Sequence, residues 1–228
     1  MARKLLAALP LALTAMMAVG APAMADVRNF PYSYPYNTQE AGEREIELYT
    51  NLNSAGKLSN QLELGFGVTD HLTMSLYGVF SNLHNDTRAF DALKLEGRYR
   101  IAEQNELPVD MGVYLEYEHP IQADAGEVEG KLLLEKTLGN FVVDSNLIAA
   151  KELADEPVSF GATLGGAYAL NDALKLGIET RYNSIGAGDK FYAGPTAALN
   201  LGGTRLVAGV YYGGSQETQG RLIIGQEF

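Results

Sequence analysis

From Gly42 to its end, the chain alternates apolar and polar residues with a period of two. Leu93, Leu95 and Tyr99, for example, fall on one face, while Lys94 and Glu96 fall on the other. Successive side chains of a β-strand point to opposite sides, so this pattern predicts strands whose faces meet different surroundings. We expect about twelve such strands, near residues 45–52, 58–68, 72–80, 93–101, 109–118, 128–138, 141–150, 158–170, 174–182, 191–201, 205–212 and 221–228.

The connections between these strands tend to alternate in length. Short turns such as Thr69-Asp70 and Asn171-Asp172 alternate with longer, acidic segments such as His119–Glu127 and Ser184–Asp189. Outer-membrane barrels have short turns at one end and longer loops at the other. We therefore predict an all-β fold, a transmembrane antiparallel up-and-down β-barrel with both chain ends on the periplasmic side.

Alternation alone leaves open which face points inward, because a soluble sandwich or a lipocalin-like barrel also alternates. Three features favour an outward apolar face. About twelve strands enclose more space than apolar side chains readily fill. The polar face is rich in Gly, Ser, Thr and charged residues, and the chain ends on an amphipathic strand with Phe228 as its last residue. A terminal aromatic residue resembles the signal that the barrel-assembly machinery reads.

The N-terminal region reads as a targeting signal followed by a leader. Arg3 and Lys4 precede the mostly apolar run Leu5–Val19, and Ala23-Met24-Ala25 offers small residues for cleavage. A membrane helix would need roughly 20 apolar residues, so we predict a signal peptide at 1–25, cleaved near Ala25. Residues 26–41 form an aromatic, proline-rich periplasmic leader, and 42–228 form the barrel. Export to the outer membrane of a Gram-negative bacterium follows.

Charge and cysteine content exclude some functions. The chain carries 28 acidic and 17 basic residues, for a net charge of −11. We predict no nucleic-acid partner for so acidic a chain, because phosphate binding needs a basic surface. There are no cysteines, which excludes disulfides and thiol-ligated metals. The acidic excess favours cations or neutral molecules as solutes.

The stretches Phe30-Pro-Tyr, Gly42-Glu-Arg-Glu-Ile-Glu and Leu62–Tyr77 resemble small Gram-negative outer-membrane β-barrel proteins described as transporters. The nearest named group is that of the phenol-degradation meta-pathway outer-membrane proteins. The resemblance covers roughly the first third of the chain, and its motifs are structural. It implies a barrel that passes a small hydrophobic or aromatic compound.

The polar face carries charges of both signs that would line a lumen. Fixed charges there could set ion selectivity, or they could form salt bridges that brace adjacent strands, such as Arg98 or Lys131 with Glu116. The candidates for lumen and selectivity roles are Glu45, Glu47, Glu63, Lys94, Glu96, Arg98, Arg100, Glu116, Lys131, Glu135, Glu179, Arg181, Arg205 and Arg221.

Catalysis and metal binding have weaker support. Ser81, His84 and Asp86 share one loop, as in a lipid-modifying enzyme of the outer leaflet, but a triad is recognised by geometry rather than by closeness in sequence. No histidine pair has ligand spacing, and no loop matches a calcium site. We predict no catalytic residues, no metal and no cofactor.

These observations favour a passive outer-membrane channel or transporter for small solutes. The alternatives are a structural or surface-interaction barrel with a filled lumen, and the lipid-modifying enzyme. The expected partners are outer-membrane lipid and lipopolysaccharide, the barrel-assembly machinery during biogenesis, and a small-molecule solute. We also expect the leader to fold into or across the periplasmic mouth.

Overall fold

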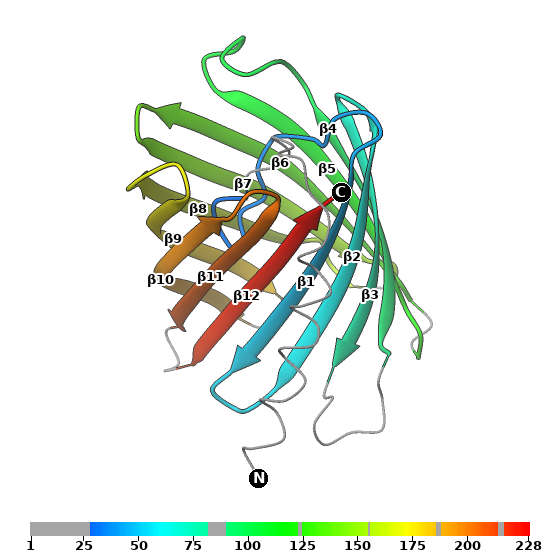
Figure 1. The fold of residues 1–228 in the computed structure, drawn as a ribbon. Coiled ribbons are helices and arrows are strands. Elements are labelled where there is room, and N and C mark those ends of the chain that lie inside the picture. Colours follow the sequence, from blue (N-terminus) through cyan, green and yellow to red (C-terminus); the bar gives the residue numbers. More distant parts are fainter. Residues whose placement is uncertain (1–27, 82–89, 123–124, 155, 186–187, 214–216) are drawn as a thin grey trace, which may run out of the picture.

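A computed structural model describes residues 28–81, 90–122, 125–154, 156–185, 188–213 and 217–228. These residues form one closed antiparallel barrel in which every strand pairs with its neighbours in sequence and β1 pairs with β12 (Figure 1). The strands are β1 Arg44–Asn53, β2 Leu58–Thr69, β3 Leu72–Ser81, β4 Ala92–Arg100, β5 Asp110–Pro120, β6 Glu127–Leu138, β7 Phe141–Glu152, β8 Ser159–Ala169, β9 Leu174–Ile185, β10 Gly188–Asn200, β11 Thr204–Gly213 and β12 Thr218–Glu227.

The even strand number brings the start of β1 and the end of β12 to the same end of the barrel. We call this the turn end, because it also carries the tight connections Asp70-His71 and Gly139-Asn140. The opposite end, which carries the connection between β1 and β2, is the loop end. The predicted fold class, an antiparallel up-and-down barrel of about twelve strands, is confirmed.

Two regions differ in detail from the sequence pattern. The segment Ser184–Asp189 was expected to be a loop, but β9 continues to Ile185 and β10 starts at Gly188. Strand β12 likewise begins at Thr218, ahead of the expected Arg221. Pairing with a neighbouring strand extends these elements beyond the stretch in which the side chains alternate clearly.

The outer face of the barrel is apolar, and its large side chains are exposed. Leu115, Phe160 and Ile178 are each more than 60% exposed. Aromatic residues gather toward both ends of this face: Tyr99, Phe141 and Tyr168 near the turn end, and Tyr117, Phe160, Tyr182, Phe191 and Tyr212 near the loop end. An apolar band between two aromatic girdles is the surface that lipid requires.

The inner face is polar and densely filled. Glu47, Glu96 and Glu179 are buried there, as are Tyr49 and Tyr77. The inside is therefore the polar face, as the alternation predicted for strands such as β1 and β4. No helix in the described part of the chain is long and apolar enough to span a membrane.

Candidate functional site

The segment before β1 lies inside the ring of strands (Figure 1). We call Arg28–Ala41 the plug segment. Phe30 and Ser33 are fully buried, and Tyr36 is 1% exposed. At the turn end, Thr38 Oγ1 donates to the Asp70 carbonyl at 2.7 Å, and Ala41 N donates to Asp70 Oδ1 at 3.0 Å. The β2–β3 turn therefore fixes the point at which the plug segment joins the barrel wall.

The deep part of the plug segment is anchored to Glu179 on β9. Ser33 donates to Glu179 Oε1 from its backbone N at 2.6 Å and from its hydroxyl at 2.8 Å. Tyr32 N donates to the same carboxylate at 3.2 Å, and the Tyr211 hydroxyl donates from β11. Hydrogen bonds to an ionised acceptor are stronger than neutral ones, so Glu179 holds the backbone here firmly.

Strand β7 supplies a second anchor. Asn146 accepts from Tyr34 N at 2.7 Å and donates to Tyr34 O at 2.9 Å, so it satisfies both backbone groups of one residue. Nearby, Asn29 donates to Asp144 Oδ2 at 3.3 Å and accepts from Lys175 Nζ at 2.6 Å. A buried irregular segment must find partners for its backbone, and the wall provides them here.

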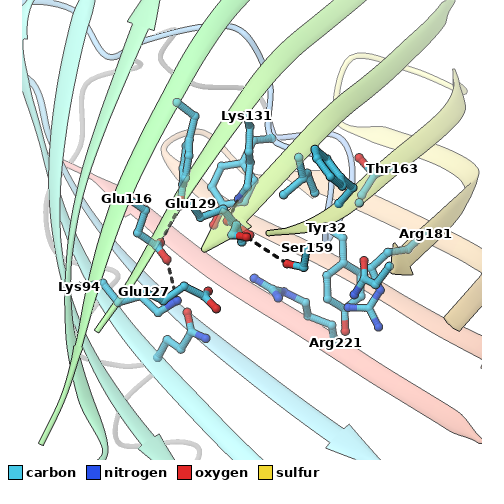
Figure 2. Close-up of a pocket in the computed structure, with 18 residues that line it drawn as sticks. Tyr32, Lys94, Glu116, Glu127, Glu129, Lys131, Ser159, Thr163, Arg181 and Arg221 are labelled. Atoms are coloured by element: carbon cyan, nitrogen blue, oxygen red, sulfur yellow. Dashed lines mark hydrogen bonds and ion pairs between the residues drawn. The ribbon is translucent and has the colours of Figure 1, made fainter. Parts of the chain in front are cut away.

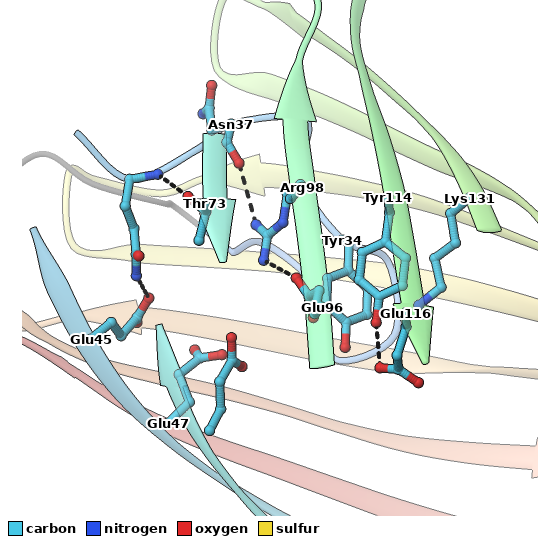
Figure 3. Close-up of polar contacts among 12 residues, drawn as sticks. Tyr34, Asn37, Glu45, Glu47, Thr73, Glu96, Arg98, Tyr114, Glu116 and Lys131 are labelled. Carbon is cyan, nitrogen blue, oxygen red and sulfur yellow. Dashed lines mark hydrogen bonds and ion pairs between the residues drawn. The ribbon is translucent and has the colours of Figure 1, made fainter. Parts of the chain in front are cut away.

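A third anchor lies near the turn end (Figure 3). Gln39 N donates to Thr73 Oγ1 at 2.8 Å, and its side-chain Nε2 donates to Glu45 at 3.0 Å. Arg98 donates to the Asn37 carbonyl at 3.3 Å and to Glu96 at 3.2 Å. Arg98 thereby links the plug segment to the charged wall.

Two glycines of the wall make room for the plug segment. A Cβ atom at Gly165 would lie 2.7 Å from the Phe30 ring, and one at Gly67 would lie 1.9 Å from the Glu40 carbonyl oxygen. Both contacts are closer than real Cβ atoms allow. The wall therefore fits this segment, since the Phe30 ring and the Glu40 backbone can come so close only where the wall residue has no side chain.

Salt bridges cross between strands on the inner face. Arg205 on β11 contacts Glu45 and Glu47 on β1, the latter at 3.0 Å, and Glu227 on β12 at 3.4 Å. Lys94 on β4 contacts Glu116 at 2.9 Å and Glu118 at 2.8 Å, both on β5. The structure thus gives Glu116 a salt bridge to Lys94.

The other predicted lumen residues also face inward. Lys131 pairs with Glu129 of its own strand at 2.9 Å. Lys131 also lies 4.0 Å from the Tyr34 ring centroid and 3.9 Å from that of Tyr114. The sequence-predicted residues that are buried are Glu45, Glu47, Glu63, Glu96, Arg98, Glu116, Glu135, Glu179 and Arg205; those partly exposed are Lys94, Arg100, Lys131, Arg181 and Arg221.

Two polar cavities lie on opposite sides of the plug segment and share no lining residue. The cavity toward the loop end has about 260 Å³ and is lined by Tyr32, Glu116, Lys131, Arg181 and Arg221 among others (Figure 2). We call it the loop-end cavity. The cavity toward the turn end, the turn-end cavity, has about 670 Å³. The plug segment contributes residues to both, so it stands between them.

The turn-end cavity is the more acidic of the two. Its lining includes Glu40, Asp70, Glu103 and Glu135, against only Arg100 and Lys175. Burial, followed by the charges of Glu135 and Asp110, raises the pKa of Tyr36 in the plug segment. The Tyr36 phenol therefore stays protonated beside these carboxylates.

Several wall residues that hold the plug segment were not predicted. They are polar residues on the inner faces of β3, β7, β8 and β11: Thr73, Asp144, Asn146, Thr163 and Tyr211. Their alternation marks them as inward-facing. The sequence carries no signal that pairs them with the plug segment, which for residues such as Asn146 lies more than 100 positions away.

The candidate catalytic loop lies largely outside the described residues, since these include Ser81 but neither His84 nor Asp86. His71 at the β2–β3 turn lies 3.1 Å from Glu103 and 2.9 Å from the Arg100 carbonyl. Among the described residues, no cluster of three or more His, Cys, Asp or Glu could hold a metal ion. Phe228 is 59% exposed, and its N donates to the Arg44 carbonyl at 2.9 Å.

No protein-family model and no curated protein sequence matches the chain. Several solved structures share the fold. The KdgM porin, solved in complex with disordered oligogalacturonate, is 10% identical with a TM-score of 0.65, over 81% of this chain and 99% of that one. An outer membrane channel from Pseudomonas putida F1 is 18% identical with a TM-score of 0.65, over 85% and 98%. Omp33 of Acinetobacter baumannii is 7% identical with a TM-score of 0.52, over 82% and 98%. The chain thus has the barrel architecture of porins and outer-membrane channels.

Proposed function

We propose that this protein is a passive outer-membrane channel for small solutes, closed at rest by its own plug segment. The observation that carries the proposal is the arrangement along the barrel axis. A closed barrel with a lipid-compatible outer face has polar cavities toward both ends, and the largely buried segment Arg28–Ala41 lies between the loop-end cavity and the turn-end cavity. A solute crosses only when this segment moves or yields.

The outer surface and the structural relatives support placement in the outer membrane. Charged side chains are inside, whereas exposed leucines and aromatics are outside, which would be costly for a protein surrounded by water. The solved relatives include a porin and an outer membrane channel by their descriptions. With the predicted signal peptide at 1–25, we place the turn end on the periplasmic side. Membership of the phenol-degradation group stays a prediction from the resemblance.

A filled structural barrel is the second candidate, and one observation favours it. The plug segment is anchored at Glu179, Asn146 and Thr73, on three separate strands. If these contacts never break, the lumen is permanently occupied and no solute passes. Selectivity by the lumen charges would then have no meaning, and their salt bridges would serve only to brace the wall.

Conductance in a planar lipid bilayer separates the two candidates. We expect the full chain to show rare or small openings, and a variant lacking residues 28–41 to show stable openings of larger conductance. The control variant Asp172→Asn, in the exposed β8–β9 turn away from both cavities, should behave like the full chain. Unchanged conductance after deletion, with the barrel still folded, would contradict the gating role of the segment.

A further inference from the structure

Two arginines contact the plug segment at the edge of the loop-end cavity. The guanidinium carbon of Arg181 on β9 lies 3.9 Å from the Tyr32 ring centroid, and that of Arg221 on β12 lies 4.6 Å from it. Both arginines and Tyr32 line the loop-end cavity. Both guanidinium groups therefore contact the ring of the same plug-segment residue, Tyr32.

Most inward-facing bases form salt bridges, but within the described residues Arg181 and Arg221 form none. Lys94, Lys131 and Arg205 each form salt bridges with glutamates. Within the described residues, no carboxylate lies within 4.0 Å of Arg181 or Arg221. Arg181 donates one hydrogen bond, to Gln219 Oε1 at 2.6 Å, and the side chain of Arg221 donates none to this part of the chain.

Stacking on aromatic rings uses the flat face of a guanidinium and leaves its in-plane N–H groups available. Arg221 also lies 5.0 Å from the Tyr49 ring centroid, and Arg181 lies 4.8 Å from that of Tyr192. The Nε atoms of both arginines are buried without a hydrogen-bond partner. The terminal N–H groups of Arg221 are not enclosed in this way, so they are the donors open to an acceptor that enters the cavity.

The opposite side of the cavity carries acids. Glu116, Glu127 and Glu129 line it together with Lys94 and Lys131, and Figure 2 shows Lys94 and Glu116 on one side with Arg181 and Tyr32 on the other. An anion entering the cavity would be repelled by the glutamates and attracted by Arg181 and Arg221. The arginine side of this cavity therefore attracts anions, although the chain as a whole is acidic.

We propose that Arg181 and Arg221 form a binding subsite for a small organic carboxylate, with the carboxylate against the guanidinium edges and the rest of the solute in the cavity. Planar guanidinium donors match carboxylate oxygens, which gives the site its chemical class. The volume of about 260 Å³ restricts the solute to a small molecule. This inference deepens the proposed channel function and rests on it for its biological meaning.

Calorimetric titration of the detergent-solubilised full chain with succinate, in a low-chloride buffer, tests the subsite directly. The neutral control ligand is succinamide. We expect succinate to bind and succinamide to bind at least tenfold more weakly. Arg181→Gln and Arg221→Gln should each weaken succinate binding about tenfold or more, because a charge-assisted contact is lost. Arg44→Gln, at the exposed start of β1, is the matched control and should leave binding unchanged.

Arg181→Lys and Arg221→Lys guard against a folding effect, since they keep the charge but lose the planar donors. Each is expected to bind succinate with intermediate affinity. Equal binding of succinate and succinamide, or succinate binding that survives both glutamine substitutions, would overturn the subsite. Because binding is measured without a bilayer, the channel function can fail in the conductance experiment while the subsite stands, and the reverse.

Discussion

Four donors converge on Glu179: the backbone N of Tyr32, the backbone N and hydroxyl of Ser33, and the hydroxyl of Tyr211. The side chain is fully buried. One carboxylate thus fixes the deepest turn of the plug segment and joins β9 to β11. At the scale of single residues, these hydrogen bonds hold the plug segment against the wall.

Glu179→Gln should loosen the plug segment without unfolding the barrel. The amide keeps one acceptor oxygen but places N–H donors against the donors of Ser33 and Tyr211. A hydrogen bond to a charged group is worth about 1.5–3 kcal/mol, so local opening should become about 10- to 150-fold more frequent. Hydrogen–deuterium exchange of the peptide containing Tyr32 and Ser33 measures this.

The matched control is Glu152→Gln, an exposed glutamate at the end of β7. Its exchange pattern should equal that of the unmodified protein. If exchange at Tyr32 and Ser33 stays slow in the Glu179 variant, then Asn146 and the close contacts at Gly67 and Gly165 hold the segment without this carboxylate.

At the scale of elements, the closure of the barrel depends on strands from opposite ends of the sequence. The β1–β12 pairing runs from Glu45 opposite Glu227 to Asn53 opposite Gln219. Arg205 on β11 reaches across β12 to Glu45 and Glu47 on β1, and also contacts Glu227. It therefore balances the charge of carboxylates on both strands of the β1–β12 pair.

Arg205→Gln should destabilise the pairing of β1 with β12, because it removes a cation that contacts the buried carboxylates Glu45, Glu47 and Glu227. Breaking a buried ion pair by removing one partner costs about 3–5 kcal/mol. We expect a lower urea midpoint, followed by circular dichroism in detergent. Arg44→Gln on the exposed edge of β1 should leave the midpoint unchanged.

The double variant Arg205→Gln with Glu47→Gln tests the electrostatic cause. It removes one of the carboxylates that Arg205 balances, so part of the lost stability should return. A double variant less stable than Arg205→Gln alone would argue that Arg205 acts through packing instead.

The strands also show which features of the fold can be predicted from the sequence alone. The alternation of Leu93 with Lys94 predicts both a strand and its inward face, because a period of two is a local property. Pro195 has no backbone N–H to donate to a ladder, and pairing of β10 with β11 is interrupted between Ala193 and Thr196, while Pro195 keeps its register with Ile178 on β9. Local chemistry was sufficient for both.

The interior could be predicted only in part. The charged residues of the inner face follow from alternation, but their partners do not, because pairing depends on register and on side-chain length across strands. The path of the plug segment depends on gaps at Gly165 and Gly67 and on acceptors such as Asn146. These positions meet the plug segment only in the folded barrel, so a linear pattern cannot reveal them.

At the scale of the whole molecule, each strand has two hydrogen-bonded neighbours and the sheet has no free edge. A closed sheet keeps its backbone polar groups paired even in an apolar medium. The molecule should therefore resist unfolding by detergent until it is heated.

Heat-modifiable migration in a denaturing gel tests this prediction. We expect the unheated protein to migrate at a position different from that of the boiled protein, because the closed barrel stays compact in dodecyl sulfate. Identical migration of the two samples would contradict a stable membrane barrel, and a soluble all-β protein boiled in parallel serves as the control.

The junction at Gly42 makes the plug segment a tethered ligand of its own barrel. Once released, its 14 residues, 28–41, can extend at most about 50 Å from this point. A ligand confined to so small a volume has an effective concentration in the millimolar range, whatever the amount of protein in the membrane. Reclosure is thus a first-order process, with a rate set by the length of the tether and not by encounters between molecules.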